Sequence, residues 1–117
     1  FTKIAACTRG GLNVTLWTGA ILSNTTITLS ENIRNFKFLT CIMGDASSPW
    51  GITMGTFMDS DLTELHFGAI YTDANSIAGA NLYGVRFNIN SPTSLTMQAC
   101  GTKSGGGAYM RKIVGWR

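Results

Sequence analysis

The residue best suited to acid–base chemistry is His66, the single histidine of the chain. A Ser-His-Asp triad or a zinc site would need partners for it, and no second histidine exists to join it. Glu64 lies two residues earlier on a segment of alternating side chains, and Arg86 occupies the corresponding face of another such segment. We therefore expect these three side chains to form a polar cluster across neighbouring strands rather than a catalytic site.

Three carboxylates gather in the segment 59–64. Two of them could serve glycoside hydrolysis if they flanked a sugar at about 5–10 Å. Asp59 and Asp61 also have the spacing of the first calcium ligands of an EF-hand, but Glu64 and Ile70 stand where that loop needs glycine and glutamate. We interpret the segment as a hairpin turn, and the sequence predicts no catalytic residue, no metal site and no cofactor.

The glycine-rich segment 101–107 could be taken for a phosphate-binding loop. That motif has glycine directly before its lysine and a helix after it. Here Thr102 precedes Lys103, and a strand is expected to follow the glycines. The segment therefore predicts a flexible hairpin tip.

Aromatic rings beside polar side chains are the remaining candidates for binding, because sugars stack their apolar faces on exposed rings. Trp50 stands in the proline-stiffened loop 47–51, and Tyr71, Asp73 and Asn75 lie together at another loop. Loops of a sandwich gather at its two ends, so these four residues could meet at one tip and bind a receptor. The alternative for Trp50 is a plug that seals the core.

The elements that must position these residues are strands. Apolar and polar residues alternate along short segments, separated by turn residues at the spacing of a sandwich or barrel. The expected strands are 1–6, 12–17, 25–30, 36–43, 52–58, 62–71, 81–89, 93–100 and 109–115. The sequence thus predicts one all-β domain over residues 1–117, an antiparallel β-sandwich of Greek-key or jelly-roll type with about nine strands and no long helix.

The segment 30–35 interrupts two strong strand signals. Ser30 can cap a single helical turn, and Glu31 suits the positive N-terminal end of that turn. Asn35 tolerates the left-handed conformation with which such a turn ends. We expect this segment to cross from one sheet to the other, as in Greek-key and jelly-roll folds.

The segment 36–43 is apolar on both faces. Phe36, Phe38 and Ile42 point one way, and the other face is formed by Leu39, Cys41 and Met43. A strand of this kind is buried on both sides, so it is either central or covered by a neighbouring subunit. Trp17 and Trp116 stand at strand ends, and we interpret them as packing or interface residues.

The composition excludes several classes of protein. Charged residues are 13% of the 117 residues, against roughly 25% in average proteins, and 44% are hydrophobic, which argues against disorder. The richest apolar run, 38–43, is far shorter than the ~20 residues that a bilayer requires. That length predicts no membrane insertion. The positive charges behind the net charge of +3 are scattered, with a small concentration at Arg111, Lys112 and Arg117, so the sequence does not predict a nucleic-acid-binding protein.

The three cysteines, Cys7, Cys41 and Cys100, lie in apolar, strand-like segments without close spacing. A small secreted scaffold would carry an even framework of cysteines. Their context favours free, buried thiols and a reducing compartment. One disulfide with a spare thiol remains open.

Segment 16–19 reads Leu-Trp-Thr-Gly, and 26–39 reads Thr-Ile-Thr-Leu-Ser-Glu-Asn-Ile-Arg-Asn-Phe-Lys-Phe-Leu. The chain ends on Tyr-Met-Arg-Lys-Ile-Val-Gly-Trp-Arg over 109–117. Together these stretches, under half of the chain, resemble bacteriophage tail-fibre and tailspike proteins. The resemblance departs at Trp116, where the family more often has a small aliphatic residue. It implies a β-sandwich at the fibre tip, a homotrimer and contact with a bacterial surface receptor, and it assigns no individual binding residue.

The sequence and this resemblance together suggest the C-terminal receptor-binding tip of a phage fibre. It would recognise bacterial surface glycan or an outer-membrane protein, without catalysis. Because Phe1 opens directly into an apolar alternating segment, we interpret the chain as a fragment of a longer fibre protein. Its expected location is the virion, after assembly in the host cytoplasm. The alternatives are a trimerisation cap without receptor contact and, less favoured, a glycan-degrading enzyme. A third, single-stranded nucleic-acid binding, would need a basic groove lined with aromatic residues.

Overall fold

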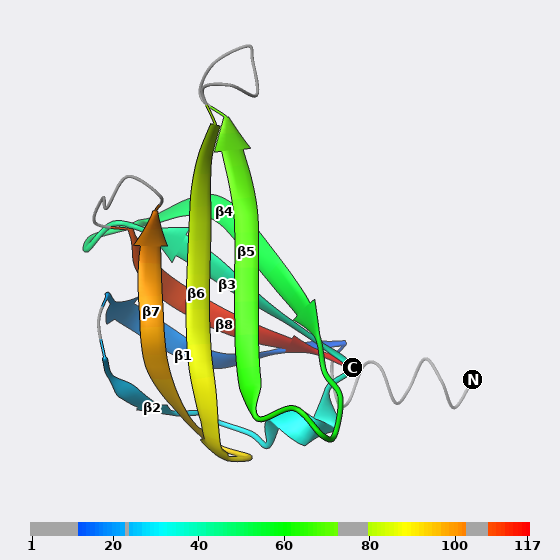
Figure 1. Ribbon diagram of the computed structural model, residues 1–117. Coiled ribbons are helices and arrows are strands. Elements are labelled where there is room, and N and C mark those ends of the chain that lie inside the picture. Colours follow the sequence, from blue (N-terminus) through cyan, green and yellow to red (C-terminus); the bar gives the residue numbers. More distant parts are fainter. Residues whose placement is uncertain (1–11, 23, 73–79, 103–107) are drawn as a thin grey trace.

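Two antiparallel sheets of four strands lie one in front of the other in a computed structural model of the chain (Figure 1). The structure describes residues 12–22, 24–72, 80–102 and 108–117. In order across the first sheet, the strands are β1 (Asn13–Ile21), β8 (Tyr109–Trp116), β3 (Phe38–Gly44) and β4 (Pro49–Phe57). The second sheet contains β2 (Thr26–Thr28), β7 (Ser94–Thr102), β6 (Ala80–Ser91) and β5 (Glu64–Thr72). The predicted all-β sandwich is confirmed.

Strands from the two ends of the described chain pair with each other. The first described strand, β1, pairs with β8 in one sheet, and β2 pairs with β7 in the other. The predicted strand over 1–6 lies outside the described residues. Two predicted hairpins are wrong, because the partners on either side lie in different sheets: 59–61 connects β4 to β5, and 103–108 connects β7 to β8.

The core lies between the inner faces of the two sheets. Phe67 on β5 and Phe87 on β6 pack edge to face, with ring centroids 6.5 Å apart. Leu39, Cys41 and Met43 of β3 face them from the opposite sheet and are fully buried. This core explains why apolar and polar residues alternate in the sequence. Successive side chains of a strand point to opposite sides of the sheet, so every second residue faces the core.

Strand β3 is central in its sheet, between β8 and β4, as its two apolar faces predicted. Its inner face is buried, whereas Phe38 and Ile42 on its outer face are half-buried. Phe36 is an exception to the predicted faces. It precedes the strand and is only 3% exposed, because its ring turns into the core against Gly115.

The predicted crossover exists, but its cap is a different residue. The turn η1 (Ile33–Asn35) is a single turn of 3₁₀ helix, and Asn32 Oδ1 accepts a hydrogen bond from the backbone N–H of Arg34 at 2.7 Å. Ser30 instead donates its hydroxyl to the carbonyl of Thr15 at 3.0 Å. The cap is displaced by two residues because Ser30 is still held beside β1.

Arg34 fastens this crossover to the connection between β4 and β5. Its guanidinium donates to the carbonyl oxygens of Asp59 at 2.6 Å and Leu62 at 2.9 Å. The carboxylate of Asp59 accepts from the backbone N–H of Asp61 at 3.0 Å. The carboxylate-rich segment is therefore a connection with a structural role for Asp59.

An ion pair joins the end of the chain to the same region. Arg117 donates to Glu31 at 2.8 and 3.1 Å, and its guanidinium lies 4.7 Å above the ring of Phe36. The hydrogen bond from Arg117 holds the pKa of the Glu31 carboxyl below its ordinary value. The final residue of the chain thus fixes the crossover.

Gly115→Ala should destabilise the fold. An added Cβ would lie 2.6 Å from the buried ring of Phe36, and we expect a loss of about 1–3 kcal/mol in the free energy of unfolding, measured by urea denaturation. Gly68→Ala is the matched control, because its Cβ would meet only the Tyr83 carbonyl at 3.8 Å. Equal stability of the two variants would contradict the packing of Phe36 on Gly115.

The Glu31 ion pair should make stability depend on acid pH. A carboxyl whose folded pKa is lowered stabilises the fold above its unfolded pKa of roughly 4.3, and this contribution is lost as the pH falls through the folded pKa. Glu31→Gln should therefore lower Tm at pH 7, and the difference from the wild type should shrink at pH 3. An undiminished difference at pH 3 would contradict the ion pair.

Candidate functional site

The structure describes the backbone of two of the four residues predicted to bind a receptor. Trp50 is the second residue of β4 and not part of a loop, because the ladder with β3 already begins at the pair Gly44 and Pro49. Tyr71 lies near the end of β5, opposite Asn81 of β6. The side chains of Trp50 and Tyr71 lie outside what the structure describes.

Asp73 and Asn75 lie wholly outside the described residues. The backbone of Trp50 belongs to one sheet and that of Tyr71 to the other. The common binding tip therefore stays a prediction, as does the alternative of Trp50 as a plug.

A tight hairpin precedes Trp50. Asp45 Oδ1 accepts hydrogen bonds from the backbone N–H groups of Ser47 at 2.8 Å and Ser48 at 2.7 Å. Gly44 is required there, since an added Cβ would lie 2.1 Å from the Ser48 carbonyl. This turn chemistry sets where β4 begins and so where Trp50 stands.

A row of three aromatic side chains crosses the outer face of the first sheet. The register aligns Trp116 of β8, Phe38 of β3 and Phe57 of β4, which we call the aromatic row. Phe57 is 78% exposed and Trp116 is 36% exposed. The rings of Phe38 and Phe57 have centroids 5.0 Å apart.

The Trp116 ring is anchored by its indole N–H, which donates to the hydroxyl of Thr40 at 3.0 Å. Gly55 leaves room for the ring of Phe38, because a Cβ there would lie 2.3 Å from its tip. Thr40 and Gly55 share the next register line with Thr15 and Val114. No residue on these two lines carries a charge, so they form one continuous uncharged surface, which we call the aromatic face.

Sequence reasoning named Trp116 as a packing or interface residue but missed Phe57. Phe57 could be identified only from the pairing of the strands, since it lies directly opposite Phe38 in the neighbouring strand. Trp17, in contrast, packs against the core, and Gly19 gives its ring room.

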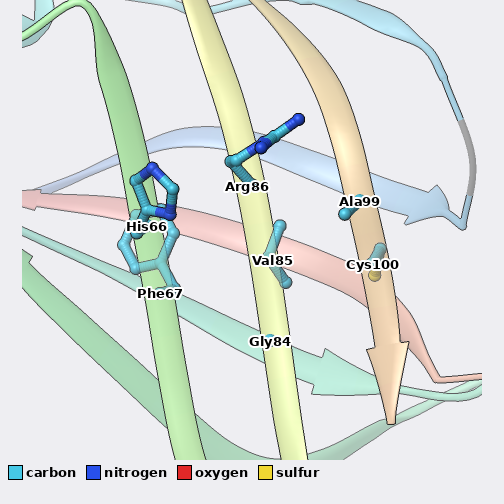
Figure 2. Close-up of a pocket in the computed structure, with 7 residues that line it drawn as sticks. All are labelled: His66, Phe67, Gly84, Val85, Arg86, Ala99 and Cys100. Atoms are coloured by element: carbon cyan, nitrogen blue, oxygen red, sulfur yellow. The ribbon is translucent and has the colours of Figure 1, made fainter. Parts of the chain in front are cut away.

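The outer face of the second sheet has a different character (Figure 2). His66 and Arg86 are register partners on β5 and β6, but the Arg86 side chain points away from His66 toward β7, so the predicted polar cluster is confirmed only for Glu64 and His66. His66 Nε2 lies 3.4 Å from the carboxylate of Glu64, and the His66 side chain is 64% exposed. Beside them is a shallow depression of about 380 Å³ with Gly84 and Cys100 among its lining residues.

Cys100 is unsuited to nucleophilic attack. Its thiol donates to the carbonyl of Ala108 at 3.3 Å, and burial raises the pKa of this thiol to about 11. Burial also raises the pKa of Cys41. Both are free cysteines, as predicted, and both thiols are protonated near neutral pH.

Across the described ranges, no three histidine, cysteine or acidic side chains cluster in a way that could hold a metal ion. In the same ranges, no helix is both long and apolar enough to span a bilayer.

Comparison with known proteins adds no family. No protein-family model matches the sequence, and a search of curated proteins finds no significant match.

The buried thiols should react slowly. In a Cys7→Ser variant, a thiol pKa of about 11 predicts that Cys100 reacts with a disulfide reagent at pH 8 on the order of 100-fold more slowly than free cysteine. Cys41 should not react until the protein unfolds. The measurement is release of thionitrobenzoate with and without guanidinium, and rapid release of two equivalents from the folded protein would contradict the burial.

Proposed function

We propose that the chain is the receptor-binding tip of a trimeric bacteriophage tail fibre or tailspike. In this proposal the tip attaches the virion to bacterial surface glycan or an outer-membrane protein and catalyses no reaction. The observation that carries the proposal is the aromatic face, an uncharged sheet surface on which Phe57 is 78% exposed.

The aromatic face fits a protein–protein contact. Interface centres are depleted in charge and enriched in aromatic residues, and large exposed apolar patches mark such contacts. The aromatic face extends across all four strands of the first sheet, which lie about 4.8 Å apart. A nucleic-acid partner would instead require concentrated positive charge.

A second copy of this chain is the partner that the topology favours. Leu12, 52% exposed, lies beside the aromatic row, and its carbonyl accepts from the backbone N–H of Arg117 at 2.8 Å. Copies joined through an upstream shaft would enter at this edge, so their aromatic faces would meet at high effective concentration.

The opposite end of the first sheet is suited to contact with a receptor. Register places Phe38 beside Trp116 but Gly44 beside Tyr109, so the β3–β4 hairpin lies far from the described chain ends (Figure 1). Trp50 follows this hairpin. In a fibre, the end away from the shaft is the one that reaches the host, and avidity from three copies would strengthen weak contacts.

The structural cap is the second candidate. The described aromatic side chains that are exposed lie on a sheet face and not at a loop tip, as a cap that only registers the chains would require. Both candidates share the assembly. They differ in whether the hairpin end binds bacteria.

Assembly is tested by the mass in solution. Light scattering should give about three times 12.6 kDa for the wild type, and Phe57→Ser should yield folded monomer, because a hydroxymethyl group replaces the exposed ring. His66→Ser, on the outer face of the other sheet, should stay trimeric. A monomeric wild type, or a trimer unaffected by Phe57→Ser, would sink the assembly.

Adhesion separates the two candidates. Labelled trimer should bind some strains of a bacterial panel or some spots of a glycan array, and Trp50→Ala should reduce binding at least tenfold while the trimer persists. A trimer that binds no strain and no glycan would favour the cap. Release of a reducing sugar from a bound glycan would indicate an enzyme instead.

A further inference from the structure

A depression of about 260 Å³ lies on the first sheet, at the hairpin end and apart from the aromatic row. The register brings Thr18 of β1, Lys112 of β8 and Ile42 of β3 onto one line across it. The lining residues are Thr18, Gly19, Ile42, Pro49, Arg111 and Lys112. They combine two cations, one hydroxyl and an apolar wall.

The two cations are neighbours in sequence and still reach the same depression, because the strand is irregular there. The register between β3 and β8 shifts between the pairs Ile42–Lys112 and Met43–Met110, which leaves Arg111 as the extra residue. Such a bulge redirects side chains that regular alternation would send to opposite faces.

Arg111 is oriented by the hairpin. Its guanidinium donates one hydrogen bond to the carbonyl of Ala46 at 3.2 Å, which leaves other N–H groups of the fork for a ligand. Asp45 belongs to the same hairpin, and its Oδ1 accepts hydrogen bonds from the backbone N–H groups of Ser47 and Ser48. None of the described lining residues carries a carboxylate.

Lys112 supplies the second charge. It is half-buried and makes no hydrogen bond or ion pair with another described residue that would neutralise it. Partial burial between Thr18 and Ile42 strengthens its attraction for an anion, because the surrounding dielectric is lower than in water.

We propose that this depression binds one anionic saccharide residue, with its carboxylate or phosphate toward Lys112 and Arg111. The Thr18 hydroxyl would bond a sugar hydroxyl, and Ile42 and Pro49 would contact the apolar side of the ring. The volume is below the ~300–1,000 Å³ of pockets for drug-sized ligands, so it suits a single ring. This inference rests on the proposed function and names the class of glycan recognised.

The test is titration of the wild-type protein, in whatever assembly light scattering finds, with three probes, and binding is measured by calorimetry or NMR. The probes are a hyaluronan tetrasaccharide with carboxylates, mannose 6-phosphate, and neutral chitotetraose. At least one anionic probe should bind at low millimolar Kd or tighter, and at least tenfold more tightly than chitotetraose. The anionic probe that binds more tightly identifies the recognised anion as carboxylate or phosphate. The Kd of that probe should rise with salt concentration.

Variants locate the site. Lys112→Gln should raise the Kd of the anionic probe at least tenfold, and Arg111→Lys should raise it less, since the charge remains while the planar fork is lost. Arg86→Gln is the matched control, because it removes the same charge from the outer face of the other sheet. Circular dichroism checks that each variant is folded.

The proposal would be overturned by no binding of either anionic probe, by equal binding of chitotetraose, or by no effect of Lys112→Gln. A single-stranded oligonucleotide that binds more tightly than both sugars would also overturn it. Bacterial adhesion that persists in Lys112→Gln would remove this inference and leave the proposed function standing. Sugar binding without adhesion to any strain would leave this inference standing and contradict the proposed function.

Discussion

The sheet of β1, β8, β3 and β4 has apolar side chains on both faces, and the described part of the chain has only one other sheet with which to cover them. The second sheet covers the inner face, where Leu39, Cys41 and Met43 are fully buried. The outer face keeps the aromatic row in solvent. Water contact with large apolar area is unfavourable by about 25 cal/mol per Å², so this face favours a partner.

The second sheet shows no such imbalance. Its outer face carries Thr26 and Thr96, whose hydroxyls lie 2.8 Å apart, and Asn90, whose amide donates to Thr96 at 2.7 Å. His66 and Glu64 continue this polar surface. The two outer faces therefore have different roles. One is polar throughout its described part, whereas the other carries the uncharged aromatic face at one end and the cations Arg111 and Lys112 at the other.

The connections hold the aromatic face in its place relative to the chain ends. Arg117 binds Glu31 and covers Phe36, and Arg34 fastens the crossover to the connection after β4. These contacts keep the last described strand beside β3, with Trp116 next to Phe38. The far end is then left to the β3–β4 hairpin and the depression around Lys112. In the proposed function, assembly and recognition would thereby use opposite ends of one sheet.

Much of the fold could be predicted from the sequence, because alternation and two-sided burial are local properties. The apolar residues of the segment 36–43 predict strand β3, although Phe36 precedes the strand. Which strands share a sheet is a long-range property, so the connections after β4 and β7 were mistaken for hairpins. The Asn32 cap was missed for a similar reason, since the alternative cap Ser30 bonds to Thr15 on another strand.

The candidate site was less accessible to sequence reasoning. Phe57 is recognised as part of an aromatic row only once it is paired with Phe38 on the neighbouring strand. The depression depends on the bulge at Arg111, and no local sequence pattern predicts that bulge. Trp50 was expected in a loop and lies in β4. The binding roles of Trp50, Tyr71, Asp73 and Asn75 remain predictions.

Hydroxyl-radical footprinting of the assembled protein tests the central claim most directly, namely that copies of the chain cover the aromatic face. Phe57 is 78% exposed in a single chain, and the His66 side chain, 64% exposed on the other outer face, serves as the internal reference. The account predicts that Phe57 is protected from oxidation in the assembly while His66 reacts freely. Oxidation of Phe57 at the rate of an exposed phenylalanine would contradict it.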